Sequence, residues 1–331
     1  MGTGRRVVWL VVGVSIAAVA AGSLVLRGDT FEPVEGAEAQ ALLDAVRTGC
    51  ETARSRISTR VGAISMRESF WKGDEKWLET ETVYRVASEG AKVKMTVDET
   101  YIRNETTTTD PGGVPIAPGT VMSKQLAFDG EKVVEYWPAE KRATVAGPES
   151  AIGSELRSIT RIIEETFPGA PDLDMEMPAP RYTTRGPAVV GREVVDGEEC
   201  VVVELVHVRV NSDGQEISWY HRYWIAPDMG FTALKAEDGY RGGRYGDGVV
   251  SVEIEAEARQ YASGLWGVSR MWARQYRLGQ SDTRELKMET VVTVADDYQL
   301  NAPVTDDMLA LRLPSGTRVK NELIDSEYTV P

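Results

Sequence analysis

Regular alternation of apolar and polar residues is the feature that most limits how this chain of 331 residues can fold. Apolar side chains such as Met66, Val93 and Met95 occupy most alternate positions of the runs 64–70 and 93–101. This period of two is typical of antiparallel strands with one face exposed to water. Tight turns are expected between such runs at Gly73-Asp74, Glu89-Gly90, Asp129-Gly130, Asp196-Gly197, Asp213-Gly214 and Asp238-Gly239.

Two other segments have helical spacing. From Ala39 to Ile57, apolar residues recur mostly at three- and four-residue steps, with charged residues on the opposite side. A second amphipathic segment runs from about Ala151 to Phe167 and is ended by Pro168-Gly169. The expected fold class is therefore α+β: a large curved antiparallel β-sheet, an incomplete β-barrel, with helices packed on its concave side.

The N-terminus predicts export. Arg5 and Arg6 precede an uncharged, mostly apolar run, Val7–Leu26. Such a run, at about 1.5 Å per residue, can just span a bilayer core as a transmembrane helix, with its cationic flank in the cytoplasm. A cleaved signal helix is the alternative, because Ala18-Val19-Ala20 fits a small-residue cleavage site. Both interpretations place the rest of the chain on the periplasmic side, and the apolar run to Leu26 favours an inner-membrane anchor.

The chain is expected to have three parts. Residues 1–27 form the signal peptide or anchor, residues 28–36 a short acidic linker, and residues 37–331 one folded domain. The segment 168–187 holds five of the fifteen prolines. Because the predicted strands on both sides are equally amphipathic, this segment is expected to be a long loop within the domain rather than a linker between two domains.

Charge excludes some partners. The chain has 37 basic and 51 acidic residues, a net charge of −14. This balance argues against a nucleic-acid partner, whose phosphates require a basic surface, and against electrostatic docking on an anionic bilayer. No sequence motif of a hydrolase, metalloprotease or phosphate-binding loop is present. We therefore expect neither an enzyme nor a cofactor. A metal site is not expected because the two His and two Cys residues are scattered.

One polar pair lies in the predicted hairpin of strands 200–210 and 215–225. Pairing across the Asp213-Gly214 turn would place Glu204 and His221 on one apolar face with Trp219 and Tyr223. A buried Glu–His pair could act as a general base or bind a polar headgroup. The simpler and favoured interpretation is a structural pair whose members satisfy each other.

The two cysteines allow one disulfide in an oxidising compartment. Cys50 lies on the apolar stripe of the first helix, and Cys200 begins a predicted strand. A buried free thiol is the favoured interpretation for Cys50, and a bridge between the two remains the alternative.

The order of these elements resembles that of the outer-membrane lipoprotein-sorting proteins, the LolA/LolB-like superfamily, in its large uncharacterised branch. The most specific part is Trp224–Phe231, in which Pro227 opens a turn and Gly230 supplies a permissive backbone. Other segments that carry the resemblance are Phe128-Asp129-Gly130-Glu131, Tyr136-Trp137-Pro138, Gly191–Cys200 and Leu313–Thr317. The likeness spans roughly residues 38–330 and includes no catalytic residue.

The resemblance implies a half-barrel whose apolar cavity accepts acyl chains. The expected function is thus non-catalytic binding of a hydrophobic ligand, a lipid or the acyl chains of a lipoprotein, in the cell envelope. A dozen buried methylenes would contribute about 10 kcal/mol gross. The candidate cavity residues are Met66, Phe70, Val93, Met95, Val97, Trp219 and Tyr223, with Glu204 and His221 as polar candidates.

Two alternatives remain open. A protein-interaction module of the same fold, such as an envelope-stress sensor domain, would have a packed interior and a conspicuous exposed apolar patch. An enzyme that uses Glu204 and His221 is the least favoured hypothesis, because no nucleophile or substrate cleft is recognisable. The chain is also longer than the sorting carriers, and an uncleaved anchor would prevent it from shuttling between membranes.

Overall fold

The structure is a computed structural model that describes residues 34–104, 116–166, 169–173, 183–211, 214–245, 248–278 and 284–331. The expected N-terminal anchor or signal peptide and most of the linker lie outside the described residues. Within these ranges, no helix combines the length and apolar character needed to cross a membrane.

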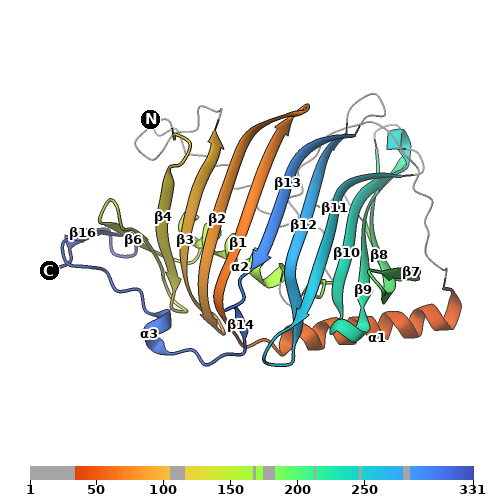
Figure 1. The fold of residues 1–331 in the computed structure, drawn as a ribbon, viewed down its shortest axis with the longest axis horizontal. Coiled ribbons are helices and arrows are strands. Elements are labelled where there is room, and N and C mark those ends of the chain that lie inside the picture. Colours follow the sequence, from red (N-terminus) through yellow and green to blue (C-terminus); the bar gives the residue numbers. More distant parts are fainter. Residues whose placement is uncertain are drawn as a thin grey trace.

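The described residues form one large, curved sheet that does not close on itself (Figure 1). Fifteen of its sixteen strands follow the order β16-β15-β6-β5-β4-β3-β2-β1-β13-β12-β11-β10-β9-β8-β7, and the sixteenth, β14, pairs separately with β1. The strands of the first half are β1 Thr59–Lys72, β2 Glu75–Glu89, β3 Lys92–Asn104, β4 Val121–Phe128, β5 Val133–Trp137 and β6 Arg142–Ala146. Those that follow are β7 Thr183–Val195, β8 Glu198–Val210, β9 Glu216–Ala226, β10 Thr232–Arg241, β11 Val249–Gln260, β12 Trp266–Leu278, β13 Arg284–Val294, β14 Gln299–Leu300, β15 Arg318–Asn321 and β16 Ser326–Thr329.

Most neighbouring strands are antiparallel, as the alternation predicts. The exception is β15, which pairs in parallel with β6 through the register Arg318↔Arg142 to Asn321↔Val145. Five of the six expected turns fall between strands, but Asp238-Gly239 lies inside β10 at a register shift against β11. An isolated glycine in a strand often marks such a bulge. The Asp-Gly pair therefore belongs to a bulge within β10, and the turn expected at this position is wrong. Part of the expected proline-rich loop also belongs to the sheet, since β7 begins at Thr183.

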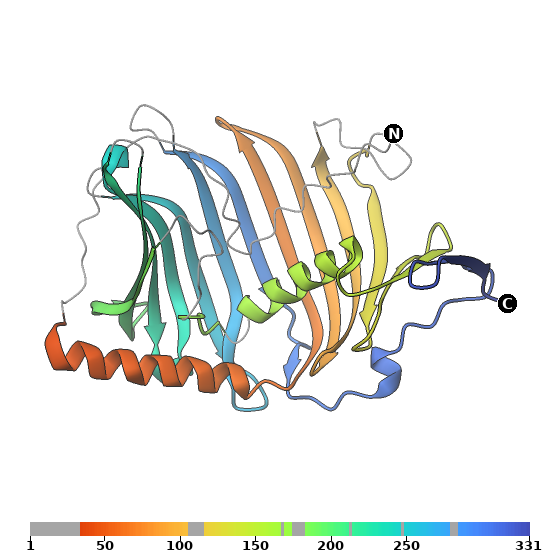
Figure 2. The same cartoon turned by 180° about the vertical axis from the view of Figure 1, so that it is seen from behind.

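Two helices lie on the same side of the sheet, which we call the inner face (Figure 2). Helix α1, Gly36–Ser55, runs across the lower ends of strands β7–β12, whereas α2, Ala151–Thr166, crosses the middle of the sheet. Both agree closely with the predicted helices. The short helices η1 Pro227–Met229, η2 Gly243–Tyr245 and α3 Asp306–Leu309 occupy connections.

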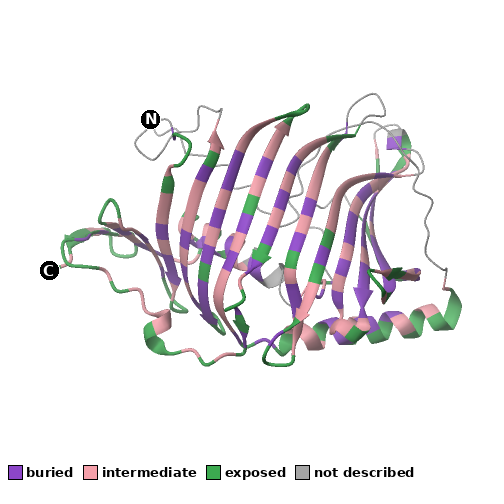
Figure 3. Ribbon diagram, in the orientation of Figure 1, coloured by how far each residue is buried: buried purple, intermediate pink, exposed green. Residues whose placement is uncertain are grey.

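The main core lies between α2 and the inner face. Leu156, Ile159 and Ile163, spaced by three and four residues on α2, pack in one cluster with buried residues of β1–β4 and β11–β13. Buried and less buried residues alternate along the central strands (Figure 3), which is the expected consequence of one covered and one open face. A second cluster joins α1 to β7, β8 and β9 through Val46, Cys50 and their neighbours.

Candidate functional site

The hairpin of β8 and β9 differs from its predicted register by one residue. Five residues, Asn211–Gln215, connect the two strands, and Asn211 holds the loop closed by accepting the backbone N–H of Gln215 at 2.9 Å. A two-residue turn would have given the other register. Because side chains alternate between faces, a one-residue shift moves one strand's residues to the opposite face of the pair. Glu204 therefore pairs with Arg222, not with the neighbourhood of His221.

Glu204 belongs to a salt-bridge cluster on the outer face. Its carboxylate accepts hydrogen bonds from Arg222 at 2.9 Å and from both terminal nitrogens of Arg241 at 2.7 Å. Both Glu204 and Arg222 are buried, and each side chain compensates the charge of the other, which would be costly to bury alone. Tyr220 stacks below the two guanidinium groups. The expected Glu204–His221 pair is therefore wrong, and the enzyme hypothesis loses the juxtaposition on which it depended.

His221 instead meets the second histidine of the chain on the inner face. The rings of His207 and His221 lie 5.5 Å apart, centre to centre, and Trp219 packs edge-on against His221 at 4.1 Å. Nδ1 of His221 lies 2.5 Å from Oδ1 of Asp238, and Nδ1 of His207 lies 3.0 Å from Oγ1 of Thr184. Both imidazoles are fully buried. We call this group the histidine pair.

The environment keeps one of these rings neutral. Burial, with a smaller effect from His221, lowers the pKa of His207 from 6.5 to about 4. The Nε2 atoms of both rings are buried and have no hydrogen-bond partner among the described residues. Sequence reasoning missed His207 and Asp238. The correct loop length would have placed His207 beside Trp219 and His221, and the strand at 232–241 would have placed Asp238 opposite His221.

The two cysteines are not brought together. Cys50 packs with Val201, Val203 and Ile225 on the inner face, whereas Cys200 belongs to the cluster of Val202 and Trp224 on the outer face. Both are buried free thiols. Burial raises the pKa of Cys50 to about 12 and that of Cys200 to about 11, so neither is a reactive thiolate at neutral pH.

The strand residues expected to line a cavity are covered. Met66, Val93, Met95 and Val97 are at most 5% exposed and pack in the cluster that α2 closes. Phe70 is only partly buried and lies 5.8 Å from the ring of Trp77. Trp219 packs against His221 of the histidine pair. Tyr223 packs against the cluster that joins α1 to β7, β8 and β9. These residues face the expected side of the sheet but do not surround one common space.

Polar atoms without partners lie beside this core. Glu68 pairs across the sheet with Thr80 and Thr290, and one oxygen of Glu68, the hydroxyl of Tyr84 and that of Thr290 are buried without a hydrogen-bond partner among the described residues. Burial, reinforced by Glu99, raises the pKa of Glu68 to about 7. The inner face therefore carries a half-titrated carboxyl group near neutral pH.

An open groove lies between α1 and two turns of the sheet. It has a volume of about 620 Å³, within the usual range of ligand sites. One wall is a stripe of small residues on α1, and the opposite wall is formed by Phe231, Leu265 and Trp266. Its lining is Asp44, Ala45, Thr48, Gly49, Thr52, Ala53, Arg56, Gly230, Phe231, Gly264, Leu265 and Trp266. We call it the α1 groove.

Phe231 is held in the α1 groove by an unusual backbone. Gly230 and Phe231 both have φ of +64°, which glycine adopts readily and phenylalanine does not. The turn is fixed by hydrogen bonds from Gly230 to Pro227 and from Phe231 to Ala226. Gly49 makes room for the ring, because a β-carbon there would lie 2.2 Å from Phe231 Cζ. Strain of this kind is concentrated at functional sites.

Part of this groove was predictable from the sequence. The Pro227–Phe231 turn belongs to Trp224–Phe231, the segment most specific to the family resemblance, and the expected permissive backbone at Gly230 is confirmed. The contribution of α1 was missed, although Ala45, Gly49 and Ala53 recur at four-residue steps and thus share one side of the helix.

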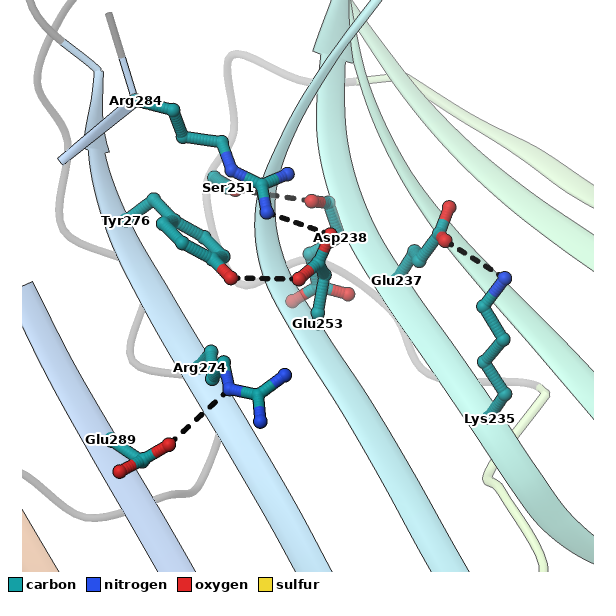
Figure 4. A network of polar contacts seen from close by, with 9 residues as sticks. All are labelled: Lys235, Glu237, Asp238, Ser251, Glu253, Arg274, Tyr276, Arg284 and Glu289. Carbon is teal, nitrogen blue, oxygen red and sulfur yellow. Dashed lines mark hydrogen bonds and ion pairs between the residues drawn. The ribbon is translucent and has the colours of Figure 1, made fainter. Parts of the chain in front are cut away.

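The outer face carries ion pairs that satisfy one another (Figure 4). Arg274 donates to Glu289 at 3.3 Å, and Glu253 accepts from Tyr276 and Arg284 at 2.8 Å each. Further along the sheet, Lys235 pairs with Glu237. The Arg274–Glu289 and Arg284–Glu253 pairs are partly exposed, and exposed ion pairs contribute little to stability. We therefore place the candidate site at the α1 groove and not on the outer face.

Comparisons with known proteins add no identity, because no family model and no curated protein matches the chain. Within the described ranges, no group of three or more His, Cys, Asp or Glu side chains is arranged to hold a metal ion.

Proposed function

We propose that this protein is a non-catalytic envelope protein that binds a hydrophobic ligand, an acyl chain of a lipid or lipoprotein, in the α1 groove of an incomplete barrel. The observation that carries this proposal is Phe231: a bulky apolar side chain is kept in a strained conformation along an open groove. A residue that only filled a core would not require that geometry.

The dimensions of the groove favour an extended chain. Its lining runs from Asp44 on α1 to Arg56 directly after the helix, twelve residues apart, which is about 18 Å along a helix. The wall along this length consists of small residues that leave space, opposite aromatic and aliphatic side chains that supply apolar contact. An extended acyl chain fits a site of this length that has small residues on one wall and apolar side chains on the other.

The ends of the groove differ in charge. Asp44 lies at one end and Arg56, which is exposed, at the other. An anionic headgroup is therefore expected at the Arg56 end, with the acyl chain running towards Asp44. This orientation keeps the headgroup in water and the methylenes in contact with Phe231 and Leu265.

The proposal is tested by filling the groove. Ala45→Trp places an indole in the lining, whereas Ala41→Trp adds the same side chain one turn away on an exposed position outside it. Full-length chains would be labelled with a photoactivatable fatty acid and the labelled peptides identified by mass spectrometry. We expect labelling in the peptides of α1 and of Phe231, at least tenfold less in Ala45→Trp, and within about twofold of the native level in Ala41→Trp.

Equal labelling of both variants would show that the fatty acid binds elsewhere. Labelling confined to strands β1 and β3 would move the site to the core under α2. No labelling at all, in a chain that unfolds cooperatively, would contradict the proposal and favour the protein-interaction module.

A further inference from the structure

The histidine pair offers two free nitrogen atoms in one buried place. The chain contains two histidines, fourteen residues apart, and the hairpin of β8 and β9 brings both to the inner face. Each ring uses its Nδ1 atom for a neighbour on the far side: Thr184 on β7 for His207, and Asp238 on β10 for His221. The two Nε2 atoms have no hydrogen-bond partner in the described part of the chain.

The hydrogen bonds define which nitrogen can bind a ligand. A carboxylate only accepts hydrogen bonds, so in the neutral form of His221 the proton is on Nδ1 and Nε2 has a free lone pair. The Thr184 hydroxyl can accept in the same way from Nδ1 of His207. An imidazole that donates its other N–H to a carboxylate or hydroxyl oxygen is the usual arrangement of a metal-binding histidine. The partner fixes the orientation of the ring and makes the free nitrogen more basic.

The spacing suits a single ion. With metal–nitrogen bonds of about 2.0–2.1 Å, two imidazoles that share an ion have ring centres roughly 4.5–6.5 Å apart. The observed separation is 5.5 Å, and the rings are nearly perpendicular. Thr184, which contacts His207 from the edge strand β7, is exposed, so the histidine pair lies one residue from the surface although both rings are buried.

We infer that His207 and His221 bind one first-row transition-metal ion through their Nε2 atoms, with Asp238 and Thr184 orienting the rings. No other metal-binding side chain completes the site among the described residues, so water or a bound molecule supplies the remaining ligands. Nitrogen ligands and an open coordination sphere favour Cu²⁺ over Zn²⁺ and Ni²⁺. This inference is independent of the proposed lipid function.

The test uses the full-length chain without a polyhistidine tag. Cu²⁺ would be titrated and its paramagnetic resonance spectrum recorded with natural and with ¹⁵N-labelled histidine. We expect one ion per chain and a nitrogen hyperfine pattern from two imidazoles that changes on labelling. This readout requires no substitution, so it remains valid if a variant fails to fold.

Three variants then locate the ion. His207→Gln and His221→Gln should each weaken Cu²⁺ binding at least tenfold, and Asp238→Asn should weaken it about 10–100-fold while keeping both nitrogen ligands. The double variant His207→Gln/His221→Gln measures adventitious binding. A spectrum unaffected by ¹⁵N-histidine, or a native affinity equal to that of the double variant, would overturn the inference.

Discussion

At the scale of single residues, Glu68 and its neighbours make the inner face sensitive to pH. The carboxyl group lies among Thr80, Thr290 and Tyr84, and its environment raises its pKa from 4.5 to about 7. A raised carboxyl pKa means that the folded protein holds a proton that the unfolded chain releases. Below pH 4.5 both states are protonated, so the effect appears only above that pH.

Stability should therefore fall as the pH rises from about 4.5 to 7 and level off above it. Between pH 5 and pH 8 the contribution of Glu68 is about 2 kcal/mol of unfolding free energy. Urea unfolding of the native chain and of Glu68→Gln at both pH values measures it. The variant should lose less stability over this range, and an identical pH dependence in both proteins would contradict the assignment.

Gly49 provides a second residue-scale prediction, in which two effects have opposite signs. In an exposed helix interior, Gly→Ala stabilises by up to about 1 kcal/mol. Here the new methyl group would meet the ring of Phe231, so Gly49→Ala should instead destabilise by about 1–3 kcal/mol. Thermal unfolding measures the sign. Stabilisation by Gly49→Ala would show that Phe231 is free to leave the helix.

Residue positions on the predicted hairpin were correct only in part. The strands and their pairing followed from alternation, but the register depends on whether the loop has an even or odd number of residues. Asp213-Gly214 suggested two, whereas Asn211 closes a loop of five. That difference separated Glu204 from His221 and concealed the histidine pair. Long-range neighbours such as Gly49 and Phe231 have no local signal, because tertiary packing alone brings them together.

At the scale of elements, α2 is the main cover of the inner face. Its apolar stripe, predicted from three- and four-residue spacing, packs on the strands that include Met66 and Met95, which were expected to line a cavity instead. Helices and hairpins were predictable because each has a periodicity set by backbone geometry. The parallel pairing of β15 with β6 was not, since a contact between distant segments leaves no such period.

Removing one contact of α2 tests this role. Ile159 is 2% exposed in the main core, so Ile159→Ala should lower the free energy of unfolding by about 2–5 kcal/mol. Ser154→Ala, on the exposed side of the same helix, should change it by less than about 0.5 kcal/mol. Chemical denaturation compares the two. Similar small effects would indicate that α2 does not close the core.

At the scale of the whole molecule, an open curved sheet presents two different faces. The outer face carries charges that pair with one another beside one apolar cluster, and the inner face carries the main apolar core, a raised-pKa carboxyl group and two buried imidazoles. The net charge of −14 agrees with a well-solvated exterior. The proposed acyl-chain site lies where α1 meets the turns at the ends of β9–β12, which leaves the α2-covered core as the structural support of the groove.

The most direct test of acyl-chain binding is native mass spectrometry of the full-length chain purified from a bacterial envelope, followed by the same measurement under denaturing conditions. We expect a native mass above that of the chain, with the excess released as an acyl-containing lipid or peptide, lost in Ala45→Trp and retained in Ala41→Trp. A native mass equal to the denatured mass, with no uptake of added lipids or acylated peptides, would contradict it.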